Sequence, residues 1–129
     1  MSALELAQSL IKIKSVSPND EGCFDLIEAQ LIPLGFAIER VPELNCETLL
    51  AKFGDSGKVF CFLGHTDIVP SGPEEEWTSP PFEANIIDGE LIGRGAADMK
   101  GSVAVFIESL KKFLKEYPKP NFQIWIMLT

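Results

Sequence analysis

Three side chains in the sequence have the types and spacing needed for metal chemistry: His65, Asp67 and Asp98. His65 is the only histidine, and it directly follows the apolar stretch 59–63 and Gly64. Imidazole and carboxylate groups are zinc ligands, and a zinc-bound histidine commonly donates its other ring N–H to a carboxylate or a carbonyl. Structural roles are also open, because Asp98 could be the N-cap of the following helix and Asp67 could close a turn.

The residue pattern around these side chains predicts an α/β domain. The run 59–63 is entirely apolar, which is typical of a strand buried on both faces, and open α/β sheets carry their functional groups at the carboxyl ends of such strands. Apolar residues at helical spacing predict a helix over 99–115, and the run 122–128 predicts another strand. A strand, a crossover helix and a parallel strand can therefore be traced from 59 to 128.

The N-terminal half supplies further elements of the predicted domain. A helix over 3–14 begins with a capping box formed by Ser2 and Glu5, and a second helix follows Asp20 and ends near Pro33. Two further strands are expected, over residues 36–41 and 48–53.

Two turn sequences predict β-hairpins. The stretch 54–57, Gly-Asp-Ser-Gly, is expected to join the strand at 48–53 directly to the strand at 59–63. Asp88 and Gly89 separate residues 84–87 from 90–92 and give the stronger hairpin signal. Between these hairpins the proline-rich segment 69–82 reads as a loop, in which we expect Trp77 to anchor the chain by packing.

Composition narrows the possible function. The 129 residues suit one domain, and a net charge of −8 without a basic cluster argues against nucleic acid or an anionic membrane as partner. No apolar run approaches the ~20 residues of a membrane span and no signal sequence is visible, so a cytoplasmic location is expected. The three cysteines have no close-spaced pair, which predicts free thiols packed as small apolar groups.

Three strings make the prediction more specific. They are Gly-His-Thr-Asp-Ile-Val-Pro-Ser-Gly at 64–72, Gly-Arg-Gly-Ala-Ala-Asp-Met-Lys-Gly-Ser at 93–102 and Ser-Val-Ser-Pro at 15–18. With Trp77, Pro81-Phe82 and Asp88-Gly89, they resemble the co-catalytic di-zinc amidohydrolases and peptidases over essentially the whole chain. The 93–102 string is most similar to the desuccinylase branch of this family, and the acetylornithine deacetylases and other N-acyl amino acid hydrolases are the alternative.

The resemblance implies a fold, a cofactor and three residue roles. The fold would be the three-layer αβα catalytic domain of zinc peptidases, with a mixed, largely parallel sheet. The cofactor would be two zinc ions, one of them replaceable by cobalt. His65 would bind one zinc, Asp98 would bridge both and precede a cis peptide bond to Met99, and Asp67 would orient His65. The partner would be a small N-acyl amino acid, and the full-length protein would be a homodimer.

The sequence also departs from the family pattern. The general-base glutamate, several metal ligands and the lid domain of the family have no counterpart within residues 1–129. The predicted strand at 122–128 is followed only by Thr129. We therefore expect an N-terminal part of the catalytic domain that binds zinc weakly and does not turn over. A truncated, non-catalytic binding module is the alternative from a different functional class.

Overall fold

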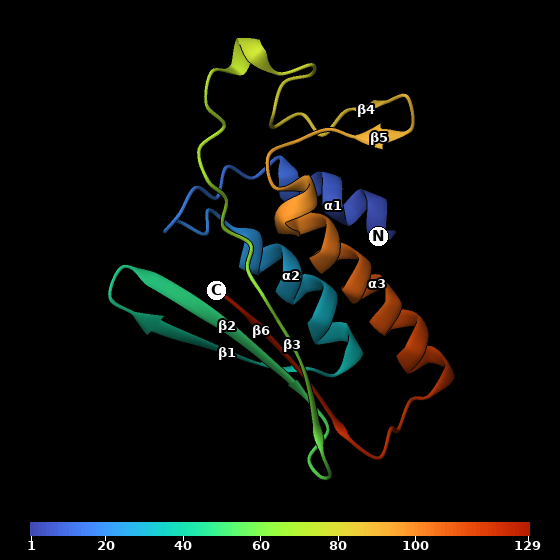
Figure 1. Ribbon diagram of the computed structural model, residues 1–129. Helices are drawn as coiled ribbons and strands as arrows, with labels where there is room; N and C mark the ends of the chain where they lie inside the picture. The colour runs from blue at the N-terminus through green and yellow to red at the C-terminus, as the bar shows by residue number, and fades with distance from the viewer.

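The computed structural model describes residues 1–129 and contains a mixed four-stranded sheet with three α-helices packed against one of its faces (Figure 1). The strand order is β1-β2-β6-β3. The strands are β1 (Ala37–Glu43), β2 (Cys46–Phe53), β3 (Val59–Gly64) and β6 (Gln123–Leu128). The helices are α1 (Ala3–Ile11), α2 (Cys23–Leu31) and α3 (Gly101–Glu116). The predicted α/β class with a mixed sheet is confirmed. The expected three layers and largely parallel pairing are not seen in these residues, since the helices cover one face and only β3 and β6 are parallel.

Side-chain hydrogen bonds explain where the first two helices begin. Glu5 N–H donates a 3.2 Å hydrogen bond to Ser2 Oγ, and Ser2 N–H donates one of 2.8 Å to Glu5 Oε2, so the predicted capping box is present. At the start of α2 the N-cap position is Gly22, and the Asp20 carboxylate, two residues earlier, accepts hydrogen bonds from the N–H groups of Gly22 and Phe24 at 3.1 Å. These bonds satisfy amide groups that have no partner inside the helix.

The first helix is shorter than the apolar pattern predicts, whereas the second ends near Pro33 as expected. The first ends at Ile11, three residues before the expected end at 14. The second ends at Leu31, after which Pro33 lies in a short 3₁₀ turn (Ile32–Leu34) and Gly35 takes a φ of 96°. Proline and a left-handed glycine are the usual signals for such an ending.

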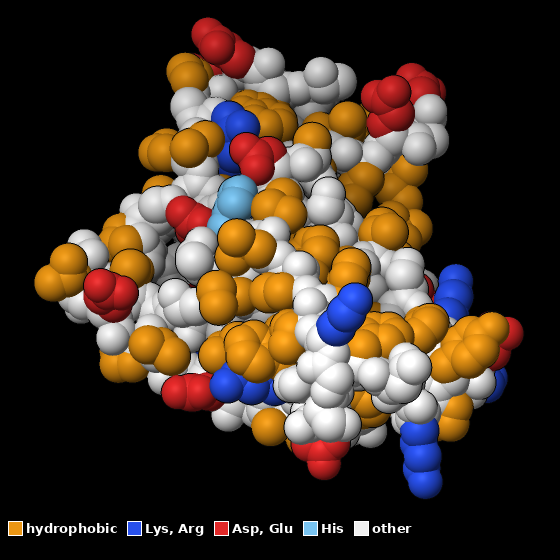
Figure 2. Space-filling model, turned by 60° about the horizontal axis from the view of Figure 1, so that its bottom comes forward, with side chains coloured by type: hydrophobic (Ala, Val, Ile, Leu, Met, Phe, Trp, Pro, Cys, Tyr) orange, Lys and Arg blue, Asp and Glu red, His pale blue; other side chains and the backbone are white.

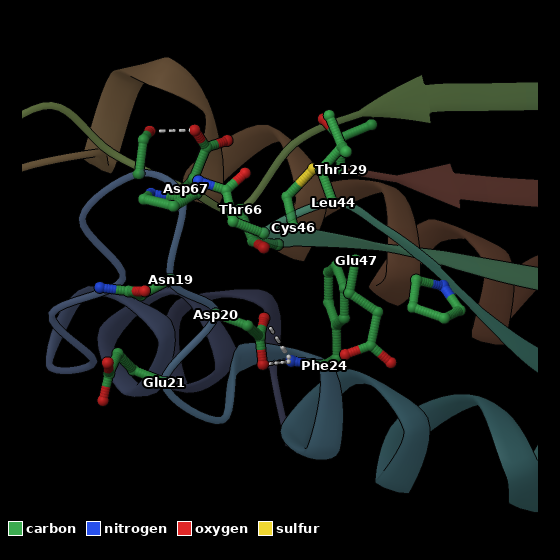
Figure 3. A pocket seen from close by; sticks show the side chains of 14 residues that line it. Asn19, Asp20, Glu21, Phe24, Leu44, Cys46, Glu47, Thr66, Asp67 and Thr129 are labelled. Carbon is green, nitrogen blue, oxygen red and sulfur yellow. Dashed lines mark hydrogen bonds between the residues drawn. The ribbon is translucent and has the colours of Figure 1, made fainter.

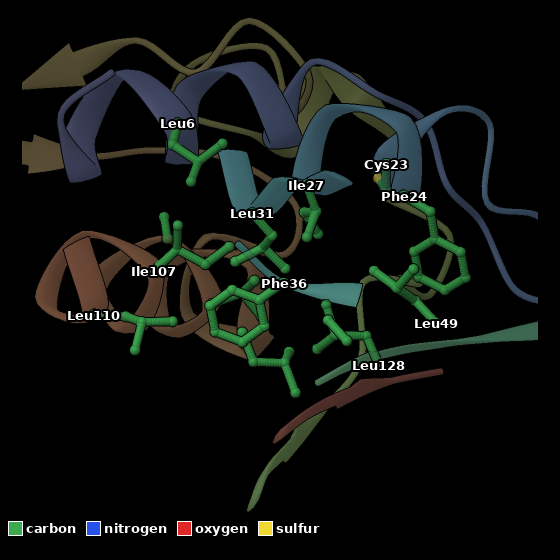
Figure 4. Close-up of a cluster of buried hydrophobic side chains, with 14 of the residues drawn as sticks. Leu6, Cys23, Phe24, Ile27, Leu31, Phe36, Leu49, Ile107, Leu110 and Leu128 are labelled. Atoms are coloured by element: carbon green, nitrogen blue, oxygen red, sulfur yellow. The ribbon is translucent and has the colours of Figure 1, made fainter. Parts of the chain in front are cut away.

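The hydrophobic core lies between the helices and the sheet (Figure 4). Along β6 every second side chain is buried, and these side chains are Ile124, Ile126 and Leu128. The apolar stripes of the three helices cover them with Leu6, Leu10, Phe24, Ile27, Leu31, Ile107 and Leu110. Complete burial of one such side chain contributes about 1.5–3 kcal/mol.

The prediction that strand 59–63 is buried on both faces is wrong. β3 is at the edge of the sheet and pairs only with β6, so its outer edge and much of its surface are exposed. Phe62 packs against Phe106 of α3 with ring centroids 4.2 Å apart, whereas Leu63 remains 66% exposed. An apolar run indicates a strand but does not show which neighbours cover it.

The predicted hairpin between 48–53 and 59–63 is also wrong. β6 lies between β2 and β3, antiparallel to β2 and parallel to β3, so the turn at 54–57 joins two strands that are not neighbours. The β2 strand forms its hairpin with β1 instead, through a tight turn at 44–45. Local turn sequence therefore located the chain reversal but not the strand partner.

The other long-range predictions are confirmed. β3 and β6 are parallel neighbours connected through α3, as the crossover prediction requires. The crossover carries an inserted hairpin, β4 (Ile86–Ile87) and β5 (Glu90–Leu91), whose turn residues Asp88 and Gly89 have φ of 52° and 81°. Positive φ at both turn positions is the requirement that an Asp-Gly pair meets.

The structure confirms only part of what the composition predicts for the cysteines. All three cysteines are free, but only Cys23 is buried, whereas Cys46 and Cys61 are exposed, so the expected packing as small apolar groups holds for Cys23 alone. None of the helices has the length and apolar character that crossing a membrane requires.

Candidate metal centre

His65 follows β3 in a segment that is held by backbone hydrogen bonds on both sides. Thr66 N–H donates to the carbonyl of Thr129 and Thr129 N–H donates to Gly64, each at 3.1 Å, so the chain stays attached to the end of β6. Ile68 N–H donates to Ser15 O at 2.9 Å on the other side. Thr66 and Ser15 are themselves fully buried. The backbone that carries His65 is therefore fixed at the carboxyl end of the sheet, as the sequence predicts.

Asp98 reaches the same place from the crossover. It lies in the π-type turn Ala96–Lys100 before α3, and the peptide bond from Asp98 to Met99 is cis, as the family resemblance implies. The N-cap position of α3 is Lys100, and no side chain caps this helix. The alternative role of Asp98 as a helix cap is therefore not observed, and its carboxylate points towards His65 instead.

The two ring nitrogens of His65 face different carboxylates. Nδ1 lies 3.0 Å from the backbone oxygen of Asp67 and 3.3 Å from its Oδ1, while Nε2 lies 3.0 Å from Asp98 Oδ1. Because Asp67 offers only acceptors to Nδ1, we assign the ring proton to Nδ1. The Nε2 lone pair then faces a carboxylate oxygen at hydrogen-bond distance, and such a pair of acceptors requires a proton or a metal cation between them.

Asp67 is held in turn by Ser17, a residue that the spacing argument did not single out. Ser17 Oγ donates a short hydrogen bond to Asp67 Oδ2, and Ser17 N–H donates to Ile68 O at 3.0 Å. The result is a chain of contacts from Ser17 through Asp67 to His65. Its only sequence signal was the Ser-Val-Ser-Pro string at 15–18.

The three predicted site residues line one open pocket of about 200 Å³. The side chain of Asp98 is 87% exposed, and those of His65 and Asp67 are 34% and 37% exposed, so all three are accessible to an incoming ion. Figure 2 shows the pale-blue histidine at the surface with acidic groups on either side of it and a basic group beyond. A cation could therefore approach without rearrangement of the chain.

A larger cavity of about 660 Å³ also has Asp67 in its lining (Figure 3). Its lining includes Asp20, Glu21 and Glu47, from the start of α2 and from β2. None of these carboxylates is within ion-pair distance of His65, whose acidic neighbours are Asp67 and Asp98. The second cavity therefore adds no ligand to the candidate centre.

Lys100 connects the Asp98 turn to the first helix, and sequence reasoning missed it as well. Its side chain is fully buried, and its Nζ donates hydrogen bonds of 2.7 Å to the carbonyl oxygens of Leu10 and Ile13. Burial lowers the pKa of the Lys100 ammonium. This contact fixes the end of α1 against the segment that positions Asp98.

The donors present fit half of a zinc site. His65 Nε2 and the Asp98 carboxylate are suitable zinc ligands, and the contact of Nδ1 with Asp67 is the usual second contact of a metal-bound histidine. No group of three or more His, Cys, Asp or Glu side chains in the chain could hold a metal ion. Zinc in proteins takes about three or four protein ligands, so these residues supply two of them.

Comparison with curated proteins gives close relatives over nearly the whole chain. Succinyl-diaminopimelate desuccinylase of Hydrogenovibrio crunogenus is 51% identical over 127 residues, and that of Alkalilimnicola ehrlichii is 48% identical over 126 residues. Each alignment covers 98% of this chain and 34% of the relative. The chain thus spans about a third of the length of the curated relatives it matches.

Solved structures with the same fold are more distant in sequence. Human carnosine dipeptidase 1 superposes with a TM-score of 0.84 at 24% identity, over 98% of this chain and 31% of its own. The metallo-carboxypeptidase Sso-CP2 of Sulfolobus solfataricus gives 0.83 at 21% identity, over 99% and 30%. These likenesses establish the fold of the chain.

A protein-family comparison covers the part of the chain that contains the candidate site. Residues 61–129, slightly more than half of the chain, match peptidase family M20/M25/M40. The match runs from within β3 to the end of β6. His65, Asp67 and Asp98 all fall within this match. The chain therefore belongs to peptidase family M20/M25/M40.

Proposed function

We propose that this chain forms the N-terminal part of the catalytic domain of a metal-dependent amide hydrolase. The substrate would be N-succinyl-LL-2,6-diaminopimelate, and the products succinate and LL-2,6-diaminopimelate, a precursor of lysine and of the cell wall. The observation that carries the proposal is the 3.0 Å approach of His65 Nε2 to Asp98 Oδ1, within a chain 51% identical to a desuccinylase over 127 residues. We further propose two zinc ions, one exchangeable for cobalt, a cytoplasmic location and a homodimer for the longer protein.

Each of the three site residues has a role that its contacts support. His65 would bind one zinc through Nε2, and the Asp98 carboxylate, with one oxygen turned to His65 and most of its surface exposed, would bridge to the second. Asp67 would keep the His65 proton on Nδ1, which leaves Nε2 free as a ligand. Ser17 would hold Asp67 in that orientation.

Zinc bound at this site would supply Lewis-acid chemistry, which polarises the amide carbonyl of a substrate. The chain itself offers the ligand pair, the orienting carboxylate and a rigid backbone at the carboxyl end of β3. It offers no glutamate beside His65 that could act as general base. We therefore expect no turnover by residues 1–129 alone.

Zinc titration by calorimetry tests the ligand assignment. The wild-type chain should bind zinc weakly, His65→Ala should abolish binding, and Asp67→Asn should weaken it about 10–100-fold because the histidine loses its orienting contact. Asp98→Asn should also lose affinity, while the matched control Asp88→Asn, an exposed turn position outside the pocket, should bind like the wild type. Equal affinities for the wild type and His65→Ala would refute the site.

A chimaeric enzyme tests the catalytic part of the proposal. Residues 1–129 would replace the matching third of the Hydrogenovibrio crunogenus desuccinylase, whose remaining length supplies the other residues. The chimaera should hydrolyse N-succinyl-diaminopimelate, and His65→Ala within it should remove activity. A folded but inactive chimaera beside an active parent would show that this chain is a non-catalytic binding module.

A further inference from the structure

Arg94 is a second polar feature of the candidate pocket. It lies between β5 and the Asp98 turn, and its backbone N–H donates a 2.8 Å hydrogen bond to Pro81 O. Its guanidinium lies 5.1 Å from the centre of the Trp77 ring, and the Trp77 indole N–H is tied to Ser71 O at 2.9 Å. Stacking on a fixed indole restricts the orientation of the guanidinium plane.

The guanidinium of Arg94 has no acidic partner within the chain. None of the ion pairs or side-chain hydrogen bonds involves it, and its Nε is buried without an acceptor. The other arginine, Arg40, is paired with both Asp25 and Glu28 at 2.5 Å. An unpaired arginine is notable in a chain with 19 acidic and 11 basic side chains.

Arg94 is also the only arginine or lysine that lines the 200 Å³ pocket containing His65 and Asp98. A planar guanidinium with free N–H groups binds a carboxylate through two parallel hydrogen bonds. From this placement we propose that Arg94 binds a carboxylate of the substrate and thereby sets its position relative to the metal ligands. This inference rests on the proposed function, since an N-acyl amino acid supplies such a group.

The proposed substrate has carboxylates of two kinds: the free end of the succinyl group and the two carboxylates of the diaminopimelate part. Two small probes separate them. N-methylsuccinamic acid carries only the acyl-side carboxylate, and N-acetylglycine carries only the amino-acid carboxylate. Both retain the amide, so that the carboxylate position is the principal difference between them.

NMR titration of the ¹⁵N-labelled chain tests the inference, with the Arg94 Nε–H and Trp77 indole N–H resonances as reporters. One of the two probes should shift the Arg94 resonance saturably in metal-free buffer containing a chelator. In the Arg94 variants, which lack that resonance, binding is followed at the Trp77 indole N–H. Arg94→Gln should weaken binding about tenfold or more, and Arg94→Lys should restore it only in part. Arg40→Gln, the same change at the arginine outside the pocket, should bind like the wild type.

The controls separate this inference from the metal proposal. Loss of the stacked guanidinium will itself move the Trp77 indole resonance. Backbone amide resonances of the 71–81 loop that match the wild type would therefore show that Arg94→Gln lost carboxylate binding rather than its loop structure. Equal probe binding by the wild type and Arg94→Gln would overturn the inference, as would failure of both probes to bind a chain that still takes up zinc through His65. Probe binding by a chain that fails to bind zinc would support the role of Arg94 and count against the metal proposal alone.

Discussion

Replacement of Gly101 by alanine gives a test in which two physical effects have opposite sign. Gly101 is the first residue of α3 and has helical dihedrals, with φ −62° and ψ −45°. At an ordinary helical position the change from glycine to alanine stabilises a protein by about 1 kcal/mol. At Gly101, however, a Cβ would stand 2.4 Å from the carbonyl oxygen of Ala96.

The close contact is expected to outweigh the gain in helix propensity. Real Cβ contacts under 3.0 Å are essentially absent, so the two atoms must separate by about 0.6 Å, and the obstacle is a backbone atom that cannot turn away as a side chain does. Overpacking of this kind costs about 1–3 kcal/mol. With the gain of about 1 kcal/mol subtracted, we expect Gly101→Ala to lower the free energy of unfolding by up to about 2 kcal/mol, instead of raising it.

Urea unfolding followed by circular dichroism measures the difference through the midpoint and the slope. Ser102→Ala, an exposed position in the same helical turn, is the control and should change stability by less than about 0.5 kcal/mol. The Ala96–Lys100 turn also carries Asp98, so Gly101→Ala should weaken zinc binding while Ser102→Ala should not. A Gly101→Ala chain more stable than the wild type would refute the steric reasoning.

Three further predictions concern the buried lysine, the buried thiol and the exposed strand edge. Lys100→Met should lower the free energy of unfolding by about 2 kcal/mol. The variant loses charge-assisted hydrogen bonds that contribute about 1.5–3 kcal/mol, and part of this loss is offset because no charge is buried any longer. Equal urea midpoints for the wild type and the variant would contradict this. Burial raises the pKa of the Cys23 thiol in the folded chain above its ordinary value of 9.0. As the pH rises, the unfolded chain therefore loses the thiol proton before the folded chain does. The free energy of unfolding then falls as the pH increases from about 9 towards the pKa of the folded chain. Cys23→Ala should remove that contribution, and urea midpoints at about pH 7 and about pH 10 should differ less than in the wild type; an equal pH dependence would refute it. Unpaired apolar edge strands associate, so the wild-type chain should show a concentration-dependent mass above the monomer by light scattering and Leu63→Lys should reduce it. A monodisperse wild-type monomer would contradict that expectation.

Much of the site was predictable because its residues follow local signals. His65 comes after a recognisable strand and Asp98 comes before a recognisable helix, so the crossover topology brings them to the same end of the sheet. The 3.0 Å approach of His65 to Asp98 agrees with that expectation. The roles of both residues at a metal stay predictions.

The errors arose where the outcome depends on long-range contacts. The apolar content of 59–63 is compatible with a central or an edge strand, and only the insertion of β6 beside β3 decides between them. Lys100 and Ser17 were missed for a related reason. Their partners, Leu10 and Asp67, are 90 and 50 positions away, and no spacing rule connects residues at such separations.

The position of β6 between β2 and β3 also has a consequence for synthesis on the ribosome. The hairpin of β1 and β2 can close as soon as both strands emerge, but β3 must wait for a partner that begins 59 residues after it ends, at Gln123. At ~5–20 residues per second, translation of that interval takes ~3–12 s. During this time β3 is an unpaired apolar strand on the nascent chain, which makes it the segment most in need of chaperone protection.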